Sequence, residues 1–81
     1  MHARVYVTLK RGVLDPQGKA VARSLEALGF DEVKDVRLGK LIEIKLAETS
    51  LERARERLEQ MCERLLANTV IEDYRIESLE P

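Results

Sequence analysis

The chain has 81 residues, with 14 lysine and arginine residues against 15 aspartate and glutamate residues and a formal net charge of −1. This length is typical of a single domain with one core, predicted over residues 1–81, and it excludes a multidomain enzyme. The near balance of charges argues against the cationic surface that non-specific nucleic-acid binding requires.

The small size and the single cysteine, Cys62, also bear on assembly and location. A chain of this length buries only about 60% of its unfolded surface, which favours self-association as a dimer or a tetramer. The lone thiol fits a reducing interior, and the N-terminus has no apolar run of the length of a signal peptide or a membrane span. We therefore expect a cytoplasmic protein with neither a nucleic-acid nor a membrane partner.

The first predicted element is a strand over residues 4–10. Val5, Val7 and Leu9 alternate there with polar side chains, which is typical of a strand with one buried face. This strand is expected to contribute one apolar face to the core.

A helix is predicted from Pro16 onward. Asp15 is a good N-cap, and a proline at the first helical position needs no N–H donor. Gly29 supplies the left-handed residue that ends the helix. Its apolar stripe consists of Val21, Leu25 and Leu28, and we expect this stripe to face a sheet.

Residues 33–46 are predicted to form two strands joined at Gly39 and Lys40. Their alternating apolar residues are Val36 and Leu38 on the first arm and Ile42, Ile44 and Leu46 on the second. This pattern indicates a β-hairpin.

A second, longer helix is predicted after the hairpin. Thr49 and Glu52 have the spacing of a capping box, and Asn68 is the expected end of the helix. The apolar stripe of this helix consists of Leu51, Ala54, Leu58, Met61 and Leu65. Residues 70–77 alternate again and predict a final strand.

The element order is therefore β-α-β-β-α-β. Layer and handedness rules fold this order into an α+β, ferredoxin-like arrangement, in which two helices lie on one face of a four-stranded antiparallel sheet. Its edge strands, expected to be the second and the fourth, offer sites where a second copy can pair.

The residues present do not form a catalytic constellation, so we predict no catalytic, cofactor-binding or metal-binding residues. His2 lies near the N-terminus and Cys62 on the long helix, which gives no nucleophile beside a base. One cysteine and one histidine cannot supply the ligands of structural zinc, and the carboxylates lack the spacing of a calcium loop. The loop at residues 11–14 matches no glycine-rich phosphate motif.

Other readings of this topology find limited support. Lys10, Arg11 and Lys19 lie near the start of the first helix, where N–H groups and the helix dipole attract anions, but solvated cations around a loop are the favoured explanation. An RNA-recognition module needs aromatic residues on its middle strands, where only Tyr6 is available. An acylphosphatase needs an asparagine on a later strand, whereas the only asparagine, Asn68, ends the second helix.

Three segments of the sequence form a distinctive series: LKRGVLDPQGKAV at residues 9–21, VRLGK at 36–40 and CERLLANTVIEDY at 62–74. In this order they closely resemble the PurS family, the small subunit of phosphoribosylformylglycinamidine synthase. The resemblance extends over nearly the whole chain. One departure is Thr69, where family members commonly have a proline, so we expect a less rigid entry into the last strand.

The resemblance implies a subunit of the purine-biosynthetic ligase that converts formylglycinamide ribonucleotide, ATP and glutamine into formylglycinamidine ribonucleotide, ADP, phosphate and glutamate. In such a complex a synthetase subunit uses ATP and Mg²⁺, and a glutaminase subunit releases ammonia. The small subunit forms dimers or tetramers, joins the other two subunits and supports ammonia transfer. The isolated chain is then expected to have no activity and to bind no cofactor of its own.

The alternative is an ACT-type regulatory domain that binds a small molecule, because such domains share this strand order. Gly12 fits the glycine that they often carry after the first strand. They are usually appended to an enzyme, however, and residues 1–81 leave no room for one.

The residues that we expect to contact the partner subunits fall in three groups along the chain. Each group also has a structural explanation, which is helix initiation, turning between strands, or helix termination with entry into the last strand. The candidates are Lys10, Arg11, Gly12, Asp15, Pro16, Gln17 and Gly18 in the first group, Arg37, Gly39 and Lys40 in the second, and Asn68, Glu72, Asp73 and Tyr74 in the third.

Overall fold

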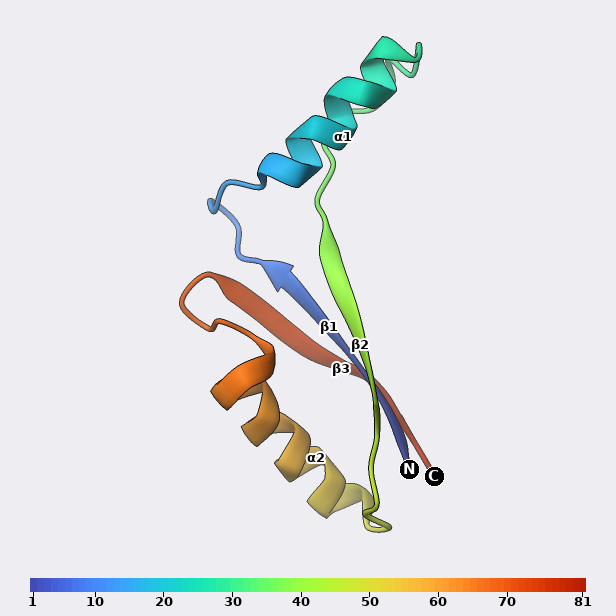
Figure 1. Ribbon diagram of the computed structural model, residues 1–81, viewed down its shortest axis with the longest axis vertical. Helices are drawn as coiled ribbons and strands as arrows, with labels where there is room; N and C mark the ends of the chain where they lie inside the picture. Colours follow the sequence, from blue (N-terminus) through green and yellow to red (C-terminus); the bar gives the residue numbers. More distant parts are fainter.

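A three-stranded antiparallel sheet is the centre of the fold. The computed structural model describes residues 1–81. The middle strand is β1 (His2–Leu9), which lies between β2 (Gly39–Lys45) and β3 (Glu72–Glu80). Both neighbours run antiparallel to β1, so both chain termini lie at one end of the sheet (Figure 1).

Two helices connect the strands. The first, α1 (Pro16–Ala27), joins β1 to β2, and the second, α2 (Leu51–Met61), joins β2 to β3. A π-helical turn, η1 (Cys62–Leu66), continues α2. Neither helix combines the length and the apolar composition that crossing a lipid bilayer requires.

The predicted ferredoxin-like arrangement, a four-stranded sheet with both helices on one face, is wrong. Residues 33–38 form no strand, so the sheet has three strands in the order β2-β1-β3. Gly39 and Lys40 do not turn a hairpin. They begin β2, where they lie opposite Thr8 and Val7 of β1. The sheet edges are therefore β2 and β3.

Side chains take up backbone hydrogen bonds that a fourth strand would have used. The Val36 N–H donates to Oδ1 of Asp35 at 2.9 Å, and the Leu38 N–H donates to Oδ2 of Asp15 at 2.8 Å. A backbone N–H that already has a side-chain acceptor gains little from strand pairing. Residues 33–38 consequently run beside α1 as an extended return segment.

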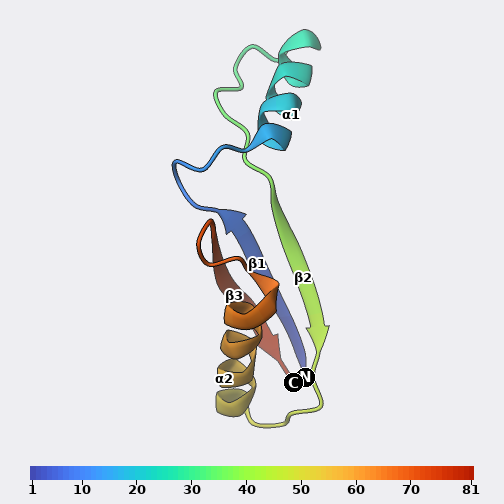
Figure 2. The ribbon, with the colours of Figure 1, turned by 60° about the vertical axis from the view of Figure 1, so that its left-hand side comes forward.

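The core lies between β1 and α2. Leu58 and Cys62 are fully buried against Val5 and Val7, as the apolar patterns of the strand and the helix predict. The other core residues are the small side chains Ala3 and Ala67. In Figure 2, α2 lies beside β1 and β3, and no helix covers β2.

The start of α2 differs from the predicted capping box. Ser50, not Thr49, is the N-cap, and its Oγ accepts a hydrogen bond from the Arg53 N–H at 3.4 Å. Glu48, not Glu52, binds the preceding backbone, because its carboxylate accepts the N–H groups of Ser50 and Thr49. These two hydrogen bonds lower the pKa of Glu48.

The α1 helix projects from the rest of the molecule. Together with the return segment it forms an arm, residues 16–38, at one end of the long axis (Figures 1 and 2). The dimensions are 49 × 26 × 14 Å and the radius of gyration is 16.0 Å, whereas a compact chain of this length has about 12 Å. The apolar stripe of α1, predicted to face the sheet, is largely exposed, and Leu28 is 73% exposed.

The pairing between β1 and β3 contains an irregularity. Arg4 lies opposite Ser78 and Val5 lies opposite Ile76, so Glu77 has no partner on β1. An extra residue of this kind is a β-bulge, which bends its strand and increases the local twist. The edge strand β3 is therefore bent near the middle of the sheet.

Replacing Leu58 by alanine should lower the free energy of unfolding by about 2–5 kcal/mol, because a fully buried leucine leaves a cavity. The control is Leu65→Ala, which removes the same atoms from a side chain that is 83% exposed; it should change stability by less than about 0.5 kcal/mol. Chemical denaturation followed by circular dichroism measures both. Equal effects of the two substitutions would contradict the assignment of the core.

Candidate partner-binding surface

The three groups of candidate residues, far apart in sequence, meet at one end of the sheet. This is the end where β1 finishes and β2 and β3 begin. We call this region the junction and define it as residues 9–18, 36–40 and 68–73. It attaches the arm to the sheet and includes the two ends of the arm, residues 16–18 and 36–38 (Figure 1).

Asp15 is the buried acidic residue of the junction, with only 6% of its surface exposed. It caps α1, as predicted, and its Oδ1 accepts the Gly18 N–H at 2.8 Å. Its Oδ2 accepts the Leu38 N–H, also at 2.8 Å. The hydrogen bonds from Leu38 and Gly18 hold the pKa of Asp15 below its ordinary value.

Arg37 binds the end of β1. Its Nη2 donates to the carbonyl oxygens of Leu9 at 3.3 Å and Lys10 at 3.1 Å. Its Nε lies 4.0 Å from Oδ2 of Asp15. The predicted partner contact therefore has a role inside this chain, where it holds the return segment against β1.

Two candidate glycines are required by close approach of the backbone. A Cβ on Gly18 would collide with the carbonyl oxygen of Val36, and a Cβ on Gly39 would lie 2.8 Å from the carbonyl oxygen of Val7. Gly12 differs, because it lies in open space with φ +86°. Gly18 and Gly39 thus serve packing, and Gly12 serves an exposed turn.

The third group of candidates closes the turn between η1 and β3. The Oδ1 of Asn68 accepts the Val70 N–H at 3.2 Å, and the Asn68 N–H donates to Oε1 of Glu72 at 2.7 Å. The other carboxylate oxygen of Glu72 lies 4.0 Å from the Lys40 ammonium. The Lys10 ammonium similarly lies 3.6 Å from Oδ1 of Asp73. These contacts tie β3 to the two other strands.

Tyr74 lies outside the junction. Its hydroxyl donates to Oε1 of Glu63 at 2.9 Å, which fastens β3 to η1. This hydrogen bond, together with burial and nearby carboxylates, raises the pKa of Tyr74 to about 12. Burial also raises the pKa of the neighbouring Cys62 thiol, and such a thiol is less reactive than an exposed one.

The structure argues against the alternative of an anion site at the start of α1. The first-turn N–H of Gly18 is already satisfied by a carboxylate of this chain, that of Asp15. Lys10 is paired with Asp73. Arg11 and Lys19, the other two cations of that alternative, are exposed and make no ion pair, as solvated cations around a loop would be, and Gln17 is also exposed. The partial positive charge at the N-terminus of α1 is therefore balanced by the carboxylate of Asp15.

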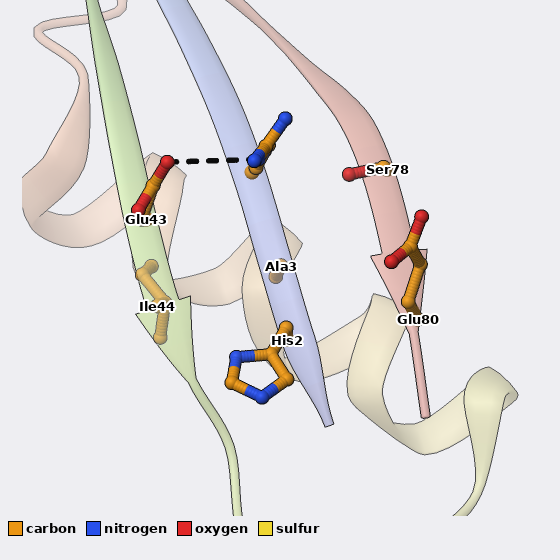
Figure 3. Close-up of a pocket in the computed structure, with 7 residues that line it drawn as sticks. His2, Ala3, Glu43, Ile44, Ser78 and Glu80 are labelled. Atoms are coloured by element: carbon orange, nitrogen blue, oxygen red, sulfur yellow. Dashed lines mark ion pairs between the residues drawn. The ribbon is translucent and has the colours of Figure 1, made fainter.

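A hollow of about 250 Å³ lies at the opposite end of the sheet, near both termini (Figure 3). His2, Glu43, Ser78 and Glu80 supply its polar groups, and Glu43 forms an ion pair with Arg4 at 3.6 Å. Ser78 makes no hydrogen bond to His2, so the two do not form a nucleophile activated by a base. The polar groups of this hollow do not combine into a catalytic arrangement.

The exposed apolar residues of the arm were not predicted from the sequence. Val21, Leu25 and Leu28 were expected to lie against the sheet, whereas Val21 and Leu28 are exposed and Leu25 is half-buried. Leu14 and Phe30 add further exposed apolar surface at the two ends of the helix. The signal was present as an amphipathic stripe, but periodicity does not say what covers such a stripe.

Comparison of the sequence with known families identifies a family that covers nearly the whole chain. Residues 2–80 match the model of a family described as PurS: Phosphoribosylformylglycinamidine (FGAM) synthase. The phosphoribosylformylglycinamidine synthase subunit PurS of Bacillus subtilis is 53% identical over 74 residues, which are 91% of this chain and 87% of that protein. The similarity therefore extends over nearly the whole length of both chains.

Solved structures show the same architecture. The structure of Thermus thermophilus PurS matches with a TM-score of 0.86 and 42% identity, covering 99% of this chain and 94% of that one. A chain in the structure of PurLQS from Thermotoga maritima matches with a TM-score of 0.83 and 32% identity, covering 98% and 99%. This coverage includes the arm as well as the sheet.

The carboxyl group of Asp15 should titrate with a midpoint below 3.8, its ordinary value. A group whose pKa is lower in the folded chain stabilises the fold above its unfolded pKa, and that contribution is lost as pH falls through the folded pKa. In NMR spectra, the amide protons of Leu38 and Gly18 should shift together on acidification, because both donate to this carboxylate. A shared midpoint at or above 3.8, or separate midpoints, would contradict the geometry.

Proposed function

Because the chain belongs to the PurS family, we propose that it is the small assembly subunit of a phosphoribosylformylglycinamidine synthase and joins a synthetase subunit to a glutaminase subunit. The observation that carries this proposal is the match to a chain of the Thermotoga maritima PurLQS structure over 98% of the present chain. The matches found are to PurS proteins, and they give no support to the ACT-type alternative.

The chemistry of the reaction belongs, in this proposal, to the partner subunits. The synthetase subunit uses ATP and Mg²⁺, and the glutaminase subunit releases ammonia from glutamine. The small subunit supplies contacts that hold the two in register and support the transfer of ammonia. The distribution of polar groups supports this division, because every charged side chain of the junction except that of Arg11 is engaged in an ion pair or a backbone hydrogen bond within the chain.

Among the candidate contact residues, we propose the exposed ones as those that meet partner subunits. Asp15, Gly18 and Gly39 serve the internal structure of the junction. Exposed side chains can instead make contacts with a second protein without disturbing the fold. This set consists of Arg11, Pro16 and Gln17. The other exposed candidates that carry a side chain are engaged within the chain, namely Arg37, Lys40, Asn68 and Asp73.

We also propose that the apolar stripe of the arm is covered by a second copy of this chain. The face of the sheet that carries α2 is not covered over β2, and α1 lies away from it (Figure 2). A helix can therefore lie beside α2 over the half-buried residues Ile42 and Ile44 of β2. An α1 from a second copy matches that position, which in a two-fold dimer is filled reciprocally.

Reconstitution tests the proposed function. Purified synthetase, glutaminase and this chain are mixed with formylglycinamide ribonucleotide, ATP, Mg²⁺ and glutamine, and product formation is measured with and without the small subunit. Glutamine-dependent turnover should be lost when the small subunit is omitted, because the glutaminase is then not held to the synthetase. Ammonia in place of glutamine is the control, and it should restore turnover.

Undiminished glutamine-dependent turnover without the small subunit would overturn the proposal. Turnover by the small subunit alone would do the same.

Sedimentation velocity tests the proposed dimer. The wild-type chain should sediment as a dimer, and Leu28→Lys should shift it to monomer, because a charge placed in an apolar contact opposes burial. The matched control is Leu65→Lys on η1, which changes an even more exposed leucine outside the arm and should leave the dimer intact. A dimer that survives Leu28→Lys would place the contact elsewhere.

A further inference from the structure

The attachment of the arm depends on the junction alone. Neither α1 nor residues 33–38 pack along the sheet or along α2 (Figures 1 and 2). The chain enters the arm through residues 10–15 and leaves it through residues 36–39. The angle between arm and sheet is therefore set by the contacts that these two crossings make.

We propose that Asp15 and Arg37 form a latch that fixes the arm at one angle to the sheet, so that its apolar stripe is presented to partners in a preset position. The latch itself is a property of the isolated chain. Its consequence for assembly rests on the proposed function.

Asp15 joins the two crossings with one buried carboxylate. Asp15 itself lies at the end of the incoming crossing. Its Oδ1 accepts the N–H of Gly18 in the first turn of α1, and its Oδ2 accepts the N–H of Leu38 in the outgoing crossing, each at 2.8 Å. Both oxygens are needed, because two N–H donors approach the group from different segments. An asparagine offers only one acceptor oxygen and turns an NH₂ group toward the second donor, so it cannot replace this carboxylate.

Arg37 joins the outgoing crossing to the sheet. One of its nitrogens, Nη2, reaches the carbonyl oxygens of both Leu9 and Lys10, where β1 ends. These are charge-assisted hydrogen bonds, which are stronger than bonds between neutral groups. The Oδ2 atom of Asp15 lies 4.0 Å from the Nε atom of Arg37. The two side chains therefore link the incoming crossing, the outgoing crossing and the end of β1 in one network.

Gly18 allows the latch to close. A side chain there would collide with the carbonyl oxygen of Val36, so the first turn of α1 and the return segment approach each other directly. The helix α1 and the return segment therefore move together as one unit. A rigid arm loses less conformational freedom on binding than a mobile one, which favours association.

The test is a distance measurement between two spin labels by pulsed electron paramagnetic resonance. The labels are attached to cysteines in the variants Glu26→Cys on α1 and Arg55→Cys on α2, both exposed sites, in a background that carries Cys62→Ala and Leu28→Lys, so that no second copy holds the arm. Labelled chains are diluted with unlabelled chains, so that only distances within one chain contribute. With the latch intact, we expect one narrow distance distribution.

Asp15→Ser separates the latch from helix capping. Serine is a good N-cap and retains an acceptor for the Gly18 N–H, but its shorter side chain provides no second oxygen for Leu38. Arg37→Met removes the hydrogen bonds to β1 while keeping a long side chain. Both variants should lose the single narrow peak. Lys19→Met is the matched control, since Lys19 is an exposed cation of the arm that makes no ion pair, and it should keep the peak.

Circular dichroism and thermal unfolding show whether each variant keeps the core, which contains no residue of the arm. A broad distribution in the latch-intact protein would overturn the proposal, and so would narrow peaks in both Asp15→Ser and Arg37→Met. These outcomes do not depend on the partner subunits, so they are distinguishable from a failure of reconstitution. Weaker assembly of the two latch variants, with Lys19→Met unchanged, would connect the arm angle to complex formation.

Discussion

Packing between β1 and α2 is the interaction on which the rest of the molecule depends. Val5 and Val7 lie on the face of β1 that is covered by α2, where they pack against Leu58 and Cys62 of the helical segment. The remaining core residues are small, so the apolar space is filled by one helix and one sheet face. A second helix of the same chain is not part of this core, and α1 is left outside it with an apolar stripe of its own.

Local signals in the sequence predicted most elements of this fold. Alternation identified β1 and the position of β3, and Asp15, Pro16 and Gly29 placed the two ends of α1. Such signals act between residues that are close along the chain, so a single sequence is enough to read them. The capping of α2 shows the limit, because three adjacent polar residues compete there and Ser50 takes the role.

The arrangement of elements was not predictable in the same way. Residues 33–38 have the alternation of a strand, but a distant carboxylate, Asp15, accepts the hydrogen bond of Leu38. Gly39 is a residue type that is typical of turns. Here glycine is needed instead because β2 passes close to the backbone of Val7. Both features depend on contacts between segments far apart in sequence, which periodicity does not report.

The candidate surface shows a similar division. Family resemblance selected three separate groups of residues, and the structure brings most of them together at the junction. The resemblance could not separate residues that build the junction, such as Asp15, Gly18 and Arg37, from exposed residues such as Gln17. A family resemblance includes residues that build the fold as well as residues that contact partners. Burial and hydrogen bonding in the structure distinguish the two kinds.

The bulge at Glu77 has a consequence for how copies of this chain add to one another. A straight, regular edge strand is a template on which further strands pair without limit, and the product is a fibre. Here the edge strand β3 is bent where it faces Arg4 and Val5, so one outer border of the sheet is a poor template for continuous growth. Association through side-chain surfaces, which closes after a fixed number of copies, is favoured over open-ended extension of the sheet at this border.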